Sequence, residues 1–160
     1  MLEMTTQRVC INGIEKDYKI VRHSGAVAIL AIDGDRMAFV WQTRPAIGRK
    51  MLEIPAGTLE FNEDPDECAV RELEEETGCR AARWEKLGVL HIAPGYSTEV
   101  IHLYLAEDLT MGEQNLDDTE DIEVRWIPLN KLDQMIRSGE ITDAKTVAGL
   151  MHLRLRNGER

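Results

Sequence analysis

The chain is poor in cysteine and in basic residues, and each shortage excludes a class of protein. Its three cysteines, Cys10, Cys68 and Cys79, are odd in number and have no CxxC spacing, which argues against a disulfide framework and against a zinc knuckle. Its 19 basic residues against 29 acidic ones give a net charge of −10, the wrong sign for holding nucleic acid through its phosphates. We therefore expect no nucleic-acid partner.

Long apolar runs and export signals are also missing. No run approaches the roughly 18 apolar residues that span a membrane, and the opening residues, MLEMTTQRVC, contain no basic stretch followed by an apolar one. A length of 160 residues with 43% hydrophobic content is ordinary for one domain around one core. We expect a single domain over residues 1–160, a cytoplasmic location and no membrane partner.

Strands and helices alternate along the chain in a mixed order. Residues 26–32 are almost wholly apolar and, after the turn Asp33-Gly34-Asp35, residues 37–42 form a similar run, which indicates central strands buried on both faces. Further strands are predicted over 8–11, 18–21, 51–55, 86–92, 100–105 and 123–127, and helices over 130–137 and 142–155. The mixture predicts an α/β fold, an α/β/α sandwich with a mixed central sheet and an N-terminal β element.

The best-marked helix has both of its ends encoded in the sequence. Asp64 suits the N-cap position, Pro65 suits the first helical position, and Gly78 ends the helix. We therefore predict a helix that begins at residue 65 and stops before residue 78.

This helix groups three glutamates on one face. Glu72, Glu75 and Glu76 follow three- and four-residue spacing, on a different face from the apolar residues. Like charges at this spacing repel one another and weaken a helix unless solvent screens them or a cation neutralises them. The group is therefore either a solvated acidic surface or a cation site.

The spacing around this helix resembles the box of the Nudix hydrolases. Residues 57–79 read GTLEFNEDPDECAVRELEEETGC, and the box is glycine, five residues, glutamate, seven residues, then Arg-Glu-apolar-x-Glu-Glu-x-Gly-apolar. The matching positions are Gly57, Glu63, Arg71, Glu72, Leu73, Glu75, Glu76, Gly78 and Cys79. Cys79 departs slightly, because the last position is more often a larger aliphatic residue. The resemblance extends over roughly residues 25–150 and favours the cation site.

The resemblance implies a set of metal ligands. Magnesium takes oxygen ligands in an octahedron and is typically held by a few carboxylates together with substrate phosphates. By resemblance the ligands are the glutamates Glu72, Glu75 and Glu76 and the backbone carbonyl of Ala56. Glu75 is also a catalytic candidate, since it can hold a second ion or a bridging water. The expected cofactor is Mg²⁺, with Mn²⁺ as the alternative.

Three other positions of the box are expected to support these ligands. Arg71 would orient a neighbouring glutamate through an ion pair. Glu63 either supports the metal ligands from behind or stabilises the start of the helix. Gly57 is needed if the loop adopts a backbone angle, or a close approach, that a side chain forbids.

The reaction implied by the box is hydrolysis of a diphosphate joined to another group, by in-line attack of water on phosphorus. The choice of substrate must come from residues outside the box. Pro94 and its neighbours resemble the ADP-ribose pyrophosphatase branch, and the expected substrate-binding residues there are Pro94, Gly95, Tyr96, Ser97 and Glu99. The alternatives are a tight turn at Pro94-Gly95 and an ordinary polar strand residue at Glu99.

Two residues before the box also belong to the predicted substrate site. Gln42-Thr43-Arg44 and the segment 51–57, MLEIPAG, resemble the same branch. Arg44 is either a surface arginine at a strand end or a bidentate ligand of the substrate diphosphate. Glu53 lies in a strand, where a buried glutamate is costly unless it is paired or faces a metal.

The acidic loop at residues 115–121 is the predicted source of the general base. In the ADP-ribose branch a glutamate in this loop activates or orients water, and the register on Glu120-Asp121-Ile122 leaves Glu120 and Asp118 as candidates. Asp118 is one methylene shorter than the glutamate of the branch, so we favour Glu120. The alternative is an acidic loop with no catalytic role.

The resemblance thus implies a magnesium-dependent hydrolase that splits ADP-ribose into AMP and ribose 5-phosphate. Another nucleoside diphosphate sugar, such as GDP-mannose, is an alternative substrate, because one pocket loop can shift specificity on an unchanged catalytic helix. A sensor that binds ADP-ribose or NAD-like ligands without hydrolysis is an alternative of a different class. The strands within residues 1–24 resemble the element by which such pyrophosphatases form homodimers, so a homodimer is expected.

Overall fold

The computed structural model describes residues 2–116 and 121–158. These residues form nine strands, three α-helices and one 3-10 turn, η1. The strands are β1 (Leu2–Ile11), β2 (Ile14–His23), β3 (Ala26–Asp33), β4 (Arg36–Arg44), β5 (Arg49–Glu53), β6 (Ala56–Thr58), β7 (Cys79–His91), β8 (Val100–Met111) and β9 (Ile122–Pro128). The helical elements are α1 (Pro65–Thr77), η1 (Leu129–Lys131), α2 (Leu132–Ser138) and α3 (Ala144–Arg156).

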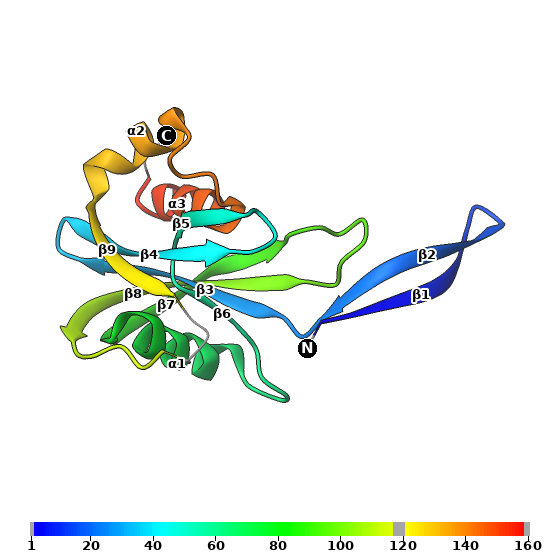
Figure 1. Ribbon diagram of the computed structural model, residues 1–160, viewed down its shortest axis with the longest axis horizontal. Coiled ribbons are helices and arrows are strands. Elements are labelled where there is room, and N and C mark those ends of the chain that lie inside the picture. The colour runs from blue at the N-terminus through cyan, green and yellow to red at the C-terminus, as the bar shows by residue number, and fades with distance from the viewer. Residues whose placement is uncertain (1, 117–120, 159–160) are drawn as a thin grey trace.

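The central sheet is mixed, as the sequence predicts. Its strand order is β5-β4-β3-β8-β7, with β6 paired to β3 and β9 paired to β4. The β3–β8 pair is parallel, whereas β3–β4, β4–β5, β4–β9 and β7–β8 are antiparallel. Helices α1 and α3 lie on opposite sides of this sheet (Figure 1). The fold is therefore the predicted α/β/α sandwich.

Strand β3 carries the core of both layers because its side chains alternate between the two faces. Val27 and Ile29 pack in one cluster with Leu73 of α1. Leu30, which points to the other face, packs with Leu150 of α3. The apolar run at residues 26–32 therefore forms a strand buried on both faces, in agreement with the sequence.

Helix α1 has the ends that the sequence predicts. The Asp64 carboxylate caps it by accepting a 2.8 Å hydrogen bond from the backbone N–H of Asp66, and Pro65 occupies the first turn. Gly78 ends the helix in the left-handed region, with φ of 72°, and its N–H donates to the carbonyl of Glu74. A left-handed residue in this place favours glycine. The register of the glutamates on the helix is thus fixed from both ends.

Several strands are longer than the sequence predicts. The predicted strands at 86–92 and 100–105 are parts of β7 and β8, which pair from Cys79 opposite Met111 to His91 opposite Val100. Their outer parts are half-exposed and lack an apolar run, so backbone pairing rather than side-chain pattern extends them. Strand β6 is absent from the prediction because Pro55 reads as a strand end.

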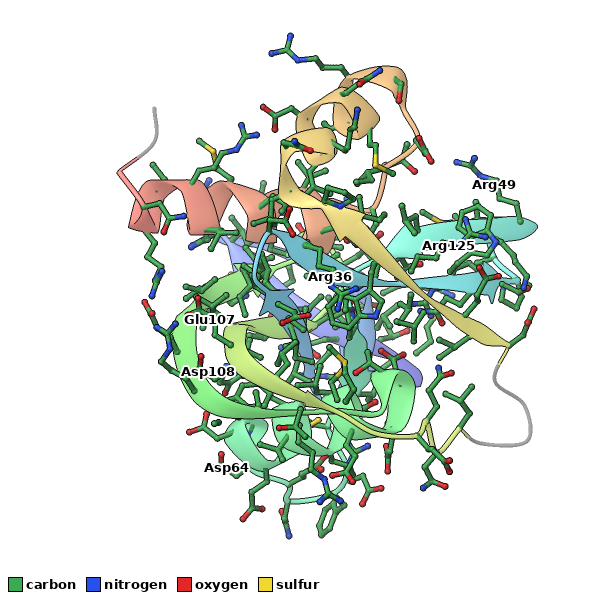
Figure 2. All side chains as sticks on the ribbon, turned by 90° about the vertical axis from the view of Figure 1, so that its left-hand side faces the viewer. Arg36, Arg49, Asp64, Glu107, Asp108 and Arg125 are labelled. Atoms are coloured by element: carbon green, nitrogen blue, oxygen red, sulfur yellow. The ribbon has the colours of Figure 1, made fainter. Side chains whose placement is uncertain are left out.

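Strand β9 covers β4 with two arginine–aromatic stacks. The Arg36 guanidinium of β4 lies 4.8 Å from the ring centre of Trp126, and that of Arg125 of β9 lies 4.5 Å from Trp41. Figure 2 shows both arginines along this pair of strands. Each contact adds a cation–π attraction to the backbone pairing. The stacks hold β9 against the strand that supplies Arg44.

Strands β1 and β2 form a separate two-stranded sheet that projects away from the sandwich (Figure 1). Its base is tied to the segment before β8. The Val21 N–H donates to the Tyr96 carbonyl at 2.7 Å, and the His23 N–H donates to Oγ1 of Thr98 at 2.9 Å.

Among the described residues, no helix combines the length and the apolar character needed to cross a membrane.

Candidate active site

Arg71 is the centre of an ion-pair cluster on α1. Its Nε and Nη2 donate to the two carboxylate oxygens of Glu63 at 2.7 and 2.9 Å, and its Nη1 donates to Glu72 at 2.8 Å and Glu75 at 2.9 Å. The hydrogen bonds from Arg71 lower the pKa of Glu63 to about 2, and those to Glu63 above all raise the pKa of Arg71. One guanidinium therefore offsets the repulsion expected between the clustered glutamates.

The remaining face of the glutamate cluster lies against β6. Glu76 is only 4% exposed, and its Oε2 accepts a 2.8 Å hydrogen bond from the backbone N–H of Ala56. A Cβ added to Gly57 would lie 1.7 Å from the carboxylate carbon of Glu72. The glycine thus provides a close approach of backbone to carboxylate, one of the two reasons for which the sequence predicts it.

These groups line an acidic cavity of about 360 Å³. Its lining residues are Gln42, Arg44, Ala56, Gly57, Thr58, Glu60, Arg71, Glu72 and Glu76. Among the described residues, no three acidic, histidine or cysteine side chains already converge as a metal site. The available donors nevertheless include the carboxylates of Glu72 and Glu76. The backbone of β6 lies close to these carboxylates because Gly57 has no side chain. This set of hard oxygen donors fits a small divalent cation such as Mg²⁺.

Arg44 is held in place by a buried carboxylate. Its Nε and Nη2 each donate to Glu53 at 2.7 Å, and Glu53 is only 2% exposed. Lys145 at the start of α3 also donates to Glu53, and lies 3.1 Å from a carboxylate oxygen of Asp143. Burial opposes ionisation of Glu53, but the bonds from Arg44 and Lys145 outweigh it and hold its pKa below the ordinary value. Glu53 is therefore paired, as its burial requires.

A second cavity of about 350 Å³ adjoins the acidic one. The two share the wall formed by Arg44 and residues 56–58. The second cavity is lined by His23, Ala26, Val27, Arg44, Ala56, Gly57, Thr58, Ile92, Glu99, Ile101, Asp143, Ala144 and Lys145. The structure thus brings Arg44 and Glu99 to one cavity, while Glu53 lies behind Arg44 and lines neither.

The segment 94–97 lines neither cavity. The backbone N–H groups of Tyr96 and Ser97 both donate to the carbonyl of Ala93, at 3.0 and 2.8 Å, which closes a tight turn. Pro94 and Gly95 are exposed within this turn. The segment therefore forms a tight turn that supports the base of the β1–β2 hairpin, and its contact with substrate stays a prediction.

The acidic loop before β9 is anchored on two elements of the site. Before the loop, the side-chain amide of Gln114 donates to the backbone carbonyl of Glu76 at 2.6 Å. The backbone N–H of Asn115 donates to the backbone carbonyl of Glu75 at 3.0 Å. On the other side Asp121 pairs with Lys50 at 2.7 Å and accepts a hydrogen bond from Thr43 at 3.1 Å. The catalytic candidates Asp118 and Glu120 lie outside the described residues.

Six polar residues that line the two cavities are missing from the sequence prediction. They are Thr58, Glu60 and Asp143, together with His23 at the end of β2, Gln42 on β4 and Lys145 on α3. Gln42 had one usable signal, since it lies two residues before Arg44 and so shares a strand face with it. His23 and Lys145 come from elements whose position depends on the tertiary fold, so no local pattern distinguishes them.

Comparison with known proteins identifies the family of this fold and site. The NUDIX domain family model matches residues 22–150. The chain is 40% identical over 148 residues to an ADP-ribose pyrophosphatase of Bacillus subtilis, covering 91% of this chain and 80% of that one. It is 40% identical over 147 residues to a methanol dehydrogenase activator of Bacillus methanolicus, covering 90% and 80%.

More distant similarities point the same way. Identity to a GDP-mannose pyrophosphatase of Cronobacter sakazakii is 34% over 160 residues, covering 88% of this chain and 83% of that one. The solved structure of an ADP compounds hydrolase superposes with a TM-score of 0.81 at 22% identity, covering 96% of this chain and 92% of that one. Because the family model spans most of the chain, which also carries the complete glutamate cluster, the chain belongs to the NUDIX domain family.

Proposed function

We propose that this protein is an enzyme that hydrolyses the diphosphate bond of nucleoside diphosphate sugars, with ADP-ribose as its main substrate and AMP and ribose 5-phosphate as products. The observation that carries the proposal is the acidic cavity, which has the Glu72 and Glu76 carboxylates beside β6 and the Arg44 guanidinium in the same lining. Similarity to the ADP-ribose pyrophosphatase of Bacillus subtilis supports the choice of substrate.

The residues that would hold Mg²⁺ are Glu72, Glu75, Glu76 and the carbonyl of Ala56. When bound, the ion neutralises phosphate charge and lowers the pKa of a coordinated water. Mn²⁺, with the same preference for oxygen ligands, is the alternative metal. Arg71, fixed by Glu63, keeps Glu72 and Glu75 in register on their helix.

Arg44 would bind the substrate diphosphate. Its planar guanidinium offers further N–H donors beyond the two that Glu53 accepts. A guanidinium matches phosphate oxygens geometrically, and the Glu53 pair fixes its plane before substrate arrives. Glu53 and Lys145 therefore act as positioning residues behind the diphosphate site.

The second cavity would take the group attached to the diphosphate. Its polar residues include His23 and Glu99, which suit the hydroxyls of a sugar. Residues 94–97 would support substrate binding by positioning Glu99, which lines this cavity. The Ser97 side chain accepts a hydrogen bond from the Glu99 N–H at 3.1 Å. GDP-mannose is the second candidate substrate, favoured by the similarity to a GDP-mannose pyrophosphatase.

Glu120 is the proposed general base, with Asp118 as its alternative. The anchors of Gln114 and Asn115 on α1 and of Asp121 on Lys50 support this role, because both tie the flanks of the loop to elements of the site. Separate Glu120→Gln and Asp118→Asn variants test it. The base is the residue whose amide variant loses turnover while ADP-ribose binding is retained, and normal rates in both variants would place the base elsewhere.

The hairpin within residues 1–24 is the proposed contact between two copies of the chain, with residues 25–160 completing a single domain. It has its own two-stranded sheet and exposes Met4, Ile11 and Ile14, apolar side chains that association would cover. Light scattering on the full chain tests this proposal. A mass near twice 18.1 kDa supports the dimer, and a mass near 18.1 kDa contradicts it.

The test of the proposed function is product analysis with ADP-ribose and Mg²⁺, beside GDP-mannose, NADH, a deoxynucleoside triphosphate and a control with chelator. AMP and ribose 5-phosphate formed fastest from ADP-ribose, and absent with chelator, are expected. Preferred turnover of GDP-mannose would replace the substrate and keep the reaction. Binding of ADP-ribose without turnover of any compound would favour the sensor, although a sensor has no need of the glutamate set.

The proposed location is the cytoplasm, to which the three free cysteines are suited.

A further inference from the structure

Gln42 has a buried amide nitrogen that finds no hydrogen-bond partner among the described residues. The side chain is 9% exposed, and its Nε2 makes no hydrogen bond within the part of the chain that the structure describes. Buried polar side chains almost always have a partner, so each exception calls for an explanation. The two ends of the amide exchange by rotation about the last side-chain torsion, which is broad, so the N–H groups can turn toward neighbouring space.

The neighbouring space is the acidic cavity. Gln42 lines it together with Glu72, Glu76 and Arg44. Gln42 and Arg44 are two residues apart on β4 and therefore project from the same face of the strand. The Gln42 side chain thus lies in the same wall as the guanidinium, and rotation of its buried amide would turn an N–H toward the space that the proposed diphosphate would occupy.

The chemistry of this wall indicates what the amide binds. The cavity that Arg44 lines is also lined by carboxylates, which are acceptors that a cation would occupy. An amide N–H is a neutral donor, and the acceptor that can lie between a cation and a guanidinium is an anionic oxygen. A phosphate oxygen meets this description, and a hydrogen bond to a charged acceptor is stronger than one to a neutral acceptor.

We propose that Gln42 binds the substrate, its side-chain amide donating a hydrogen bond to a non-bridging phosphate oxygen of the diphosphate. The proposal rests on the proposed function, since it deepens the description of the same site. It assigns to the diphosphate a neutral contact from β4 in addition to the charged one from Arg44. The free protein carries the unpaired amide, and substrate supplies the missing acceptor.

If Gln42 binds substrate, replacing it should lower the affinity for ADP-ribose without lowering the stability of the protein. Gln42→Met keeps the length and most of the volume of the side chain but removes both polar atoms. Because no hydrogen bond to the described residues is lost and a buried unpaired donor is removed, the melting temperature should stay the same or rise. The Kd for ADP-ribose in EDTA should increase about 10-fold or more, because the bond to a charged acceptor is lost. Calorimetric titration in EDTA measures this Kd without turnover, because the chelator removes the metal that hydrolysis needs.

Two further variants complete the test. Gln42→Glu keeps the shape but places a carboxylate against the phosphate and beside Glu72 and Glu76, so it should weaken binding more than Gln42→Met. His102→Leu is the matched control. His102 Nδ1 is the second buried atom without a partner among the described residues, and His102 lines neither cavity of the site. Its removal should leave the Kd and the KM unchanged.

The outcomes distinguish this proposal from the proposed function. An unchanged Kd in Gln42→Met, or a fall in melting temperature with unchanged Kd, overturns the role of Gln42 and leaves the hydrolase intact. If the wild-type chain binds ADP-ribose without producing AMP, the proposed function fails, and the ratio of Kd values still decides the role of Gln42. If it binds only GDP-mannose, the ratio for GDP-mannose decides, since both compounds contain a diphosphate. Binding of neither compound overturns both proposals.

Discussion

The carboxylate of Glu53 accepts two parallel hydrogen bonds of 2.7 Å from the guanidinium of Arg44, from Nε to Oε1 and from Nη2 to Oε2. The two residues are on neighbouring antiparallel strands, β4 and β5, joined by a short turn. The buried carboxylate has a second partner in Lys145. Two cations from different elements therefore share one anion beneath the cavities.

Glu53→Gln should impair both binding and stability. The neutral amide can no longer compensate Arg44 and Lys145, and removing one partner of a buried ion pair costs about 3 kcal/mol. Because Arg44 also loses its fixed plane, the KM for ADP-ribose should rise about 10-fold. Urea unfolding and steady-state kinetics measure the two effects. Glu123→Gln, which removes the exposed partner of Arg125, should change neither, and equal effects of both variants would contradict the positioning role.

Glu76→Gln should abolish most of the activity and leave the fold intact. The amide oxygen can still accept the hydrogen bond from the Ala56 N–H, whereas the charge needed for a cation is lost. Loss of groups that only support metal ligands costs 10–100-fold, so we expect a fall of at least about 100-fold in kcat/KM. Full activity with an unchanged melting temperature would remove Glu76 from the metal site.

Gly57→Ala should disturb Glu72 specifically. The new Cβ would lie 1.7 Å from the Glu72 carboxylate carbon, and the carboxylate must move away. We expect a decrease of at least about 10-fold in Mg²⁺-dependent turnover, with the affinity for Mg²⁺ reduced in titrations of activity against metal concentration. Normal metal dependence would mean that Glu72 is not a ligand.

The Arg71–Glu63 pair predicts how the stability of the protein responds to acid. Hydrogen bonds from Arg71 lower the pKa of Glu63 from 4.5 to about 2 in the folded chain. A group with a lowered pKa stabilises the fold above its unfolded pKa, and that contribution disappears as the pH falls through the folded value. The loss should therefore occur between pH 4.5 and about 2. Denaturant unfolding across this range should give a shallower pH dependence for Glu63→Gln than for the wild type, and parallel curves would contradict it.

The elements that the sequence predicts best are those with local signals. Asp64, Pro65 and Gly78 define α1 to the residue, because capping depends on neighbours in the chain. The apolar run of β3 likewise predicts a strand buried on both faces. The family resemblance then places Glu72 and Glu76 beside Ala56, and the structure brings these residues together.

What the sequence misses depends on contacts between distant elements. Lys145 lies in the first turn of an amphipathic helix and reads as an ordinary surface lysine, yet its partner Glu53 lies 92 residues away. The spacing of Gln42 to Arg44 indicates a shared strand face, but only the structure shows that this face lines the cavity. The Pro94-Gly95 motif is a tight turn in the structure, closed by hydrogen bonds to the carbonyl of Ala93. Its predicted contact with substrate stays a prediction, because a turn of this kind can also present its residues to a ligand.

Among the described residues, the two cavities share Arg44 and residues 56–58, and in the proposed function this shared wall separates hydrolysis of the diphosphate from binding of the sugar. The first cavity contains carboxylates of α1, while the second takes walls from β2, β8 and the start of α3. Under the proposed function, substitutions at His23, Ile92 or Glu99 would alter the preferred sugar and leave the carboxylates on α1 in place. A fold partitioned in this way lets new specificities arise by drift in one compartment, at little risk to the reaction performed in the other.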